Sequence, residues 1–343
     1  MKYYTIYILV LSVLLCMSCN KQTEDETILK DIQAKIAQQY PAVDGSTSTH
    51  PLQRKIACDI LGLPWTWSDN SNANIHRTII PDELKTNDVN AIKTVLAIQP
   101  SGTHGSYMNL IDGKTDFILV ARAPSQDELD HAGKTNVALN VKAVALDAFV
   151  FLTHSTNPIE NLSLKQVVSI YSGGVEDWTE LGITIREGSN AQSTAQPITA
   201  YQRNRNSGSQ ELMDKLVMKE VPAMDMPELI TNSMLGPYNV IGGDRWTGDG
   251  GDPLGLGYTV YFYGKFMFPH TYVKIMKING IMPDAETIAA KKYPLYTEVF
   301  AAVRETEAKD STAALLMTWI FTPTGQASVG ESGYVPVLEK PLR

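Results

Sequence analysis

Three short segments of the sequence combine glycine with hydroxyl side chains, and each is followed by a helical pattern of apolar residues. They are Gly-Ser-Thr-Ser-Thr-His at 45–50, Ser-Gly-Thr-His-Gly-Ser at 101–106, and Asn-Ser-Gly-Ser-Gln at 206–210. The start of a helix carries free backbone N–H groups and a partial positive charge, and glycine lets a ligand approach the backbone closely. One such segment alone is typical of an ordinary helix N-cap. Three of them predict a shared site for an oxyanion.

Two arginines lie near these segments, at the ends of predicted strands. Arg122 follows the apolar run 117–121, and Arg203 stands four residues before Ser207. Ligands of open α/β sheets bind where strands end, and a guanidinium group matches two oxygens of a tetrahedral anion. We therefore expect both arginines to bind the anion, and we expect Arg205, inside the third segment, to be solvated.

The elements that must position these segments alternate between strands and helices. The sequence predicts strands over 91–98, 117–121 and 144–153, and a helix over 164–171 behind the N-cap Ser163. The other predicted elements are an amphipathic helix over 27–40, a strand over 198–201, and helical runs over 52–60, 107–111 and 211–219. Such alternation is typical of an α/β fold with a parallel or mixed sheet flanked by helices.

The first residues have the pattern of an export signal. Lys2 precedes an apolar stretch over 6–15 that is too short to span a membrane, and a small residue precedes Cys19. The pattern indicates a lipoprotein signal peptide over 1–18, with Cys19 as the lipidated residue at the start of a polar tether. Cys16 as the acceptor and a plainly cleaved signal stay open as alternatives.

The size, charge and motifs of the chain argue against several classes of function. With 343 residues the chain is long enough for two hydrophobic cores, and a formal net charge of -8 without a basic tract argues against a nucleic-acid partner. The six histidines show no metal-ligand spacing, and there is no nucleophile elbow or Walker loop. His50 and His104 are either general acids or, as we favour, loop residues in contact with solvent. We expect no cofactor and no metal, and we interpret the glycine-rich stretch 242–257 as a solvated loop rather than a calcium site.

An ordered set of short motifs runs from about residue 42 to the C-terminus. The motifs are Asp-Gly-Ser-Thr at 44–47, Gly-Thr-His-Gly at 102–105, Gly-Lys-Thr-Asp at 113–116, Ala-Arg-Ala-Pro at 121–124, Asn-Pro at 157–158, Ile-Tyr-Ser-Gly at 170–173, Asp-Trp-Thr-Glu-Leu-Gly at 177–182, Arg203 with Ser-Gly-Ser at 207–209, Leu-Gly-Tyr at 256–258, Tyr-Pro-Leu at 293–295, and Gly-Tyr-Val-Pro at 333–336. Together they resemble the phosphate-binding receptors of the high-affinity phosphate ABC transporters, in the type II periplasmic binding protein class.

The resemblance implies a set of anion contacts. They fall on Thr47, Ser48, Thr103, Arg122, Arg203, Ser207, Gly208 and Ser209. The family carries an aspartate where Arg122 stands, to accept the proton of hydrogen phosphate, whereas an arginine cannot accept a hydrogen bond. With two arginines and no acidic group in the three segments, we expect weak discrimination between hydrogen phosphate and sulfate.

The resemblance also implies a two-lobed α/β fold with the ligand cleft between the lobes. We expect a tether and short helix over 19–39, a first lobe made of 40–145 and 263–343, and a second lobe made of 146–262, with crossings near 145–150 and 256–262. It further implies a monomeric lipoprotein, anchored outside the cytoplasm, that binds phosphate or a similar oxyanion for an ABC permease and does not catalyse a reaction. A phosphate- or sulfate-ester hydrolase, or a surface binding protein without a transport role, are the alternatives.

Overall fold

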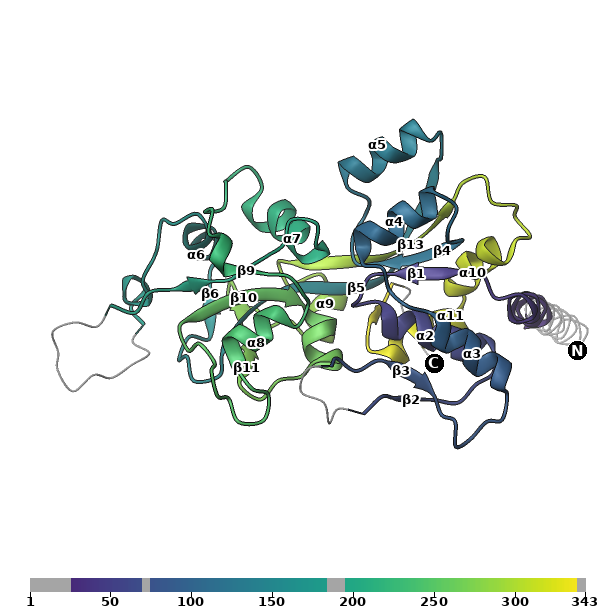
Figure 1. Cartoon of the computed structure of the whole chain (residues 1–343), viewed down its shortest axis with the longest axis horizontal. Coiled ribbons are helices and arrows are strands. Elements are labelled where there is room, and N and C mark those ends of the chain that lie inside the picture. The colour runs from purple at the N-terminus through teal and green to yellow at the C-terminus, as the bar shows by residue number, and fades with distance from the viewer. Residues whose placement is uncertain (1–25, 70–74, 184–194, 338–343) are drawn as a thin grey trace, which may run out of the picture.

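The computed structural model describes residues 26–69, 75–183 and 195–337. Within these residues the chain forms two α/β lobes placed end to end, and one sheet runs through both (Figure 1). The sheet has eight strands in the order β1-β4-β13-β5-β10-β7, with β11 and β14 pairing β5 in addition.

The first lobe contains both ends of the described chain. Its strands are β1 (Val43–Gly45), β2 (Trp65–Trp67), β3 (Ile79–Pro81), β4 (Phe117–Val120), β13 (Tyr296–Arg304) and β14 (Val335–Pro336). Its helices are α2 (His50–Ile60), α3 (Val89–Ala97), α4 (Thr103–Ile111), α5 (Gln126–Lys134), α10 (Thr312–Ile320) and α11 (Pro323–Ser332), preceded by a helix over 26–38.

The second lobe is built from the middle of the chain. Its strands are β6 (Asn161–Leu162), β7 (Thr199–Ala200), β8 (Gln202–Arg203), β9 (Ile230–Thr231), β10 (Gly255–Val260), β11 (Val273–Ile275) and β12 (Lys277–Ile278). Its helices are α6 (Leu164–Tyr171), α7 (Gly208–Leu212) and α8 (Gly236–Gly242), with 3-10 helices at Trp178–Leu181 and Pro227–Leu229 and π-helices at Met213–Met218 and Tyr263–Met267. The short helix α9 (Ala285–Ala289) packs against β5 and β14.

The strand β5 (Leu139–His154) joins the lobes. It pairs antiparallel with β13 up to Ala148 and with β10 from Phe149 onward. From Val144 onward the strand is buried, and most of its side chains there are apolar, because elements of both lobes cover it. The change of partner lies inside the segment 145–150, where the sequence analysis placed the first crossing.

The later strand pairings favour a return crossing after the segment 256–262 that the sequence analysis expected. After 256–262, β11 still pairs with the far end of β5, and β12 pairs with β6, so residues 273–278 stay with the second lobe. The chain rejoins the first lobe only with β13, which pairs with β4. We propose that the return lies between residues 279 and 295, because these backbone pairings cannot form if 263–278 belong to the first lobe.

The strand predicted over 91–98 is wrong, because these residues form most of α3. Its buried apolar residues are Ala91 and Val95, four positions apart, which is a helical spacing that the apolar residues on either side of Lys93 and Thr94 conceal. The Asp88 side chain caps the helix by accepting a hydrogen bond from the Ala91 N–H at 2.9 Å. The strands over 117–121 and 144–153 and the helices over 27–40 and 164–171 are confirmed within a few residues.

The glycine-rich stretch 242–257 forms a loop and the strand β10, held by its own aspartates. Asp244 accepts hydrogen bonds from the Trp246 and Thr247 N–H groups, and Asp252 accepts one from the Tyr201 hydroxyl. In the described part of the chain no group of His, Cys, Asp or Glu side chains could hold a metal ion. Over the same residues, no helix has the length and apolar character needed to cross a membrane.

Candidate functional site

The three glycine-hydroxyl segments meet around one cavity of about 450 Å³ between the lobes. Its wall is formed by Ser46, Thr47, Ser48, Ser101, Gly102, Thr103, His104, Gly105, Ala121, Arg203, Asn204, Asn206, Ser207, Gly208, Ser209, Asn232, Met234 and Val260. The structure therefore brings together all the predicted anion contacts except Arg122.

The first segment connects β1 to α2 and is held rigidly. The Ser46 N–H donates to the Leu119 carbonyl at 3.0 Å, and the Thr49 hydroxyl donates to the same carbonyl at 2.6 Å. A Cβ atom on Gly45 would lie 2.1 Å from that carbonyl oxygen, so only glycine fits there. These contacts fix Thr47 and Ser48 at the cavity wall.

The second and third segments face each other from opposite lobes. Gly102 takes the positive φ of 81° that ends the preceding loop, and α4 begins at Thr103. Across the cavity, a Cβ atom on Gly208 would lie 2.9 Å from the Thr103 hydroxyl oxygen. The Ser207 hydroxyl caps α7 by accepting a hydrogen bond from the Gln210 N–H. The N-termini of α4 and α7 are therefore close enough for both to contact one small anion.

Arg203 carries the charge of the cavity. The residue is only 5% exposed, and its Nε donates to the Thr231 carbonyl at 3.1 Å while Nη1 lies 3.2 Å from the Met234 sulfur. Among the described residues no carboxylate forms an ion pair with it, and desolvation lowers its pKa from the ordinary arginine value. A buried cation without an acidic partner is costly, so an anion in this cavity would supply the missing charge.

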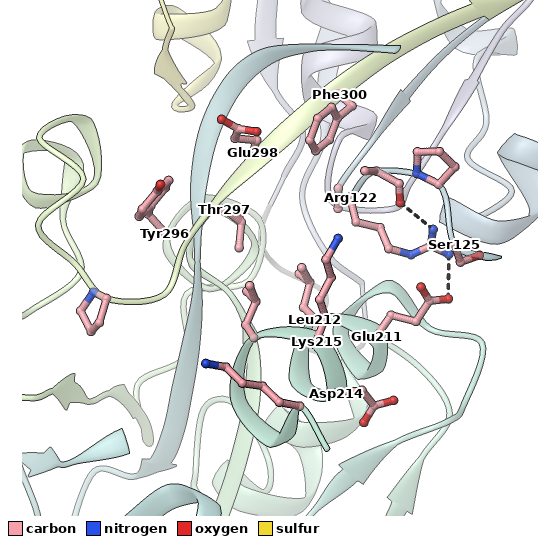
Figure 2. Close-up of a pocket in the computed structure, with 16 residues that line it drawn as sticks. Arg122, Ser125, Glu211, Leu212, Asp214, Lys215, Tyr296, Thr297, Glu298 and Phe300 are labelled. Atoms are coloured by element: carbon pink, nitrogen blue, oxygen red, sulfur yellow. Dashed lines mark hydrogen bonds and ion pairs between the residues drawn. The ribbon is translucent and has the colours of Figure 1, made fainter. Parts of the chain in front are cut away.

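Arg122, the other arginine expected to bind the anion, does not lie on the wall of this cavity, and its guanidinium is paired with carboxylates. Nη1 and Nη2 each donate to a carboxylate oxygen of the fully buried Glu128 at 2.8 Å, and Nη2 also donates to Glu211 at 2.8 Å. Figure 2 shows Arg122 and Glu211 in contact on the wall of a separate cavity of about 650 Å³. Since Glu211 lies 89 residues away on α7 of the other lobe, local sequence gave no signal for this partner.

The two histidines of the predicted segments have different environments. His50 is buried, its Nε2 lies 2.9 Å from the Ile98 carbonyl oxygen, and desolvation lowers its pKa to about 4. It is therefore neither the solvent-exposed loop residue that we favoured nor a member of the cavity wall. His104 does lie on the wall, and its Nδ1 is 3.0 Å from the Glu128 carboxylate.

Several cavity residues escaped the sequence analysis. Asn204 and Asn206 stand beside Ser207 in the third segment, so their polar side chains were a signal that could have been used. Asn232 and Met234 had no such signal. They reach the wall because β9 pairs with β8, which places residues that follow Thr231 next to Arg203.

The chain is similar to several known proteins. A model of the PBP superfamily domain matches residues 85–324. The protein SphX of Synechocystis is 21% identical over 71% of this chain and 70% of its own length, and the phosphate-binding protein PstS of Borreliella burgdorferi is 20% identical over 74% of this chain and 84% of its own. A solved substrate-binding protein of Clostridium perfringens with bound phosphate, assigned to phosphate ABC transport, has 20% identity and a TM-score of 0.57 over 86% of this chain and 98% of its own. By its domain and its two-lobed fold, the chain belongs to the PBP superfamily.

Proposed function

We propose that this protein is a solute receptor that binds inorganic phosphate, or a similar tetrahedral oxyanion, between its lobes for ABC-type uptake. The observation that carries the proposal is Arg203, a buried cation without a carboxylate partner in a cavity otherwise lined by hydroxyls, amides and helix starts. The names of the relatives, which include phosphate-binding proteins, support phosphate as the anion.

Titration calorimetry tests the proposal. The purified protein should bind phosphate with a measurable heat, and sulfate, molybdate and tungstate are the competing tetrahedral anions to compare. Absence of binding to all four anions would contradict the proposal and favour the alternative of a surface protein without a transport role.

We propose binding rather than catalysis at this site. Nucleophilic catalysis needs a hydroxyl in hydrogen-bond contact with its base, and among the described residues no hydroxyl of the cavity wall makes such a contact with His104. Steady turnover of a chromogenic phosphate or sulfate ester, lost in His104→Gln, would instead support the hydrolase alternative.

We further propose that the protein works outside the cytoplasm as a monomer, held to the membrane by a lipid on Cys19 and delivering its ligand to a permease. The signal peptide and Cys19 lie outside the described residues, and the support for them is the sequence pattern alone. Mass spectrometry of the mature N-terminus checks it. A diacylglyceryl group on Cys19, absent in Cys19→Ser, is the expected result, and an unmodified residue after a cleaved signal would contradict it.

A further inference from the structure

The cavity offers hydrogen-bond donors from most of its wall. The hydroxyls, the backbone N–H groups at the starts of α4 and α7, and Arg203 all can donate to an anion. In the described part of the chain no aspartate or glutamate lies on this wall. An oxyanion that still carries a proton needs, in addition, one group that accepts its O–H.

His104 has the hydrogen-bonding pattern of such a group. The Glu128 carboxylate accepts hydrogen bonds from both Nη atoms of Arg122 and from the Ser125 N–H, and its Oε1 lies 3.0 Å from Nδ1 of His104. Because a carboxylate only accepts, Nδ1 must carry the hydrogen of the imidazole. In the neutral ring the lone pair is then on Nε2, which has no hydrogen-bond partner among the residues that the structure describes.

We propose that His104 determines which anions the cavity accepts, by using Nε2 to accept the O–H of a protonated oxyanion such as hydrogen phosphate. This inference rests on the proposed function of the cavity. A fully deprotonated anion such as sulfate would place an oxygen lone pair against the Nε2 lone pair, and it is therefore rejected. Arg122 and Glu128 act as positioning residues, because they fix the tautomer of His104 and do not touch the anion.

Competition of sulfate against labelled phosphate, on the full chain, tests the proposal. At about pH 8.5 the ratio of the two dissociation constants should favour phosphate by at least about a hundredfold, because the O–H of hydrogen phosphate finds an acceptor and sulfate has no O–H to offer. His104→Lys offers only donors, so it should lower the ratio at least about tenfold and bind sulfate more tightly than the unmodified protein does. His104→Gln, whose amide can accept or donate, should be intermediate.

His131→Gln is the matched control. His131 also faces a carboxylate, with Nε2 at 2.8 Å from Asp112, but it lies away from the cavity and should leave the ratio unchanged. If phosphate and sulfate bind with equal affinity, or if His104→Lys keeps the original ratio, the role of His104 is wrong while the proposed function stands. If neither phosphate nor sulfate binds, this inference fails, and the proposed function fails with it when molybdate and tungstate do not bind either.

Discussion

Arg122 and Arg203 are both almost fully buried, with 6% and 5% exposure, yet they serve different purposes. Arg122 forms ion pairs with two carboxylates, one from each lobe. Arg203 has no acidic partner among the described residues, which supports the proposal that it binds the anion. Sequence predicted that both would be ligands, because residue type and position at a strand end were the same for each. The two arginines differ because Glu128 and Glu211 contact the guanidinium of Arg122, and these contacts are known only from the folded chain.

Arg203→Met should weaken phosphate binding strongly while leaving the empty protein about as stable as before. A charge-assisted contact contributes about 1.5–3 kcal/mol, so the dissociation constant should rise roughly ten- to a hundredfold or more, whereas removing an unpaired buried charge costs the empty fold little. Calorimetry and chemical denaturation measure the two effects. Arg205→Met, at an exposed position of the same loop, is the control, and equal affinity in both variants would remove Arg203 from the site.

Arg122→Met should show the opposite pattern. It leaves the Glu128 carboxylate buried without its main partner, which is expected to lower the free energy of unfolding by about 3–5 kcal/mol. Urea denaturation of the empty protein measures this loss. In Arg122→Met combined with Glu128→Gln the uncompensated charge is gone, so much of the stability should return, and a double variant as unstable as the single one would contradict the explanation.

At the scale of elements, sequence patterns located helices and strands well where burial is one-sided. The helix over 164–171 was predicted with its exact bounds, because Ser163 and Gln166 form a capping box at its start. The run 91–98 was misassigned, since its apolar residues are too dense to show which ones face the core. The helical run predicted over 211–219 starts earlier, at Gly208, and continues from Met213 as a π-helix. The spacing of apolar residues does not distinguish a π-helix from an α-helix here.

The close approach of α4 and α7 makes Gly208 a sensitive position. A methyl group there would lie 2.9 Å from the Thr103 hydroxyl oxygen, so Gly208→Ala should push the two helix starts apart and weaken phosphate binding by about tenfold or more. Gly133→Ala, where an added Cβ meets nothing within 4 Å, is the matched control. Thr103→Ala removes the crowded oxygen, so Gly208→Ala should weaken binding less in the Thr103→Ala background than in the unmodified protein. An equal effect in both backgrounds would count against a steric cause.

At the scale of the whole molecule, the lobes are tied together by a buried carboxyl group. Asp147, on β5, accepts hydrogen bonds from the Ala148 N–H at 2.8 Å and from the Phe262 N–H at 3.0 Å. Desolvation by complete burial raises its pKa to about 7. One titratable group therefore joins the first-lobe part of β5 to the segment that follows β10, which sequence could not reveal because 115 residues separate Asp147 from Phe262.

This group should make stability depend on pH. Its pKa is higher in the folded chain than the ordinary value of 3.8, so folding favours the protonated form, and that stabilisation is complete below about pH 4 and is lost as the pH rises through about 7. Relative to Asp147→Asn, the unmodified protein should lose roughly 2–4 kcal/mol of unfolding free energy across this range. Denaturation at a series of pH values measures the difference. Asp310→Asn, at an exposed position, should show no such trend.

The position of β13 has a consequence for how the chain is made. This strand inserts between β4 and β5, yet it is synthesised after the entire second lobe. When only about the first 290 residues have left the ribosome, β13 is missing from the sheet. The strands β4 and β5 then lack the partner that lies between them and cannot form their hydrogen bonds to it. We expect the nascent chain to remain protease-sensitive until Arg304 has emerged, because the pairings of β13 join segments far apart in the chain and can form only then. Delayed closure of this kind would keep the chain open for passage across a membrane, as the proposed export requires.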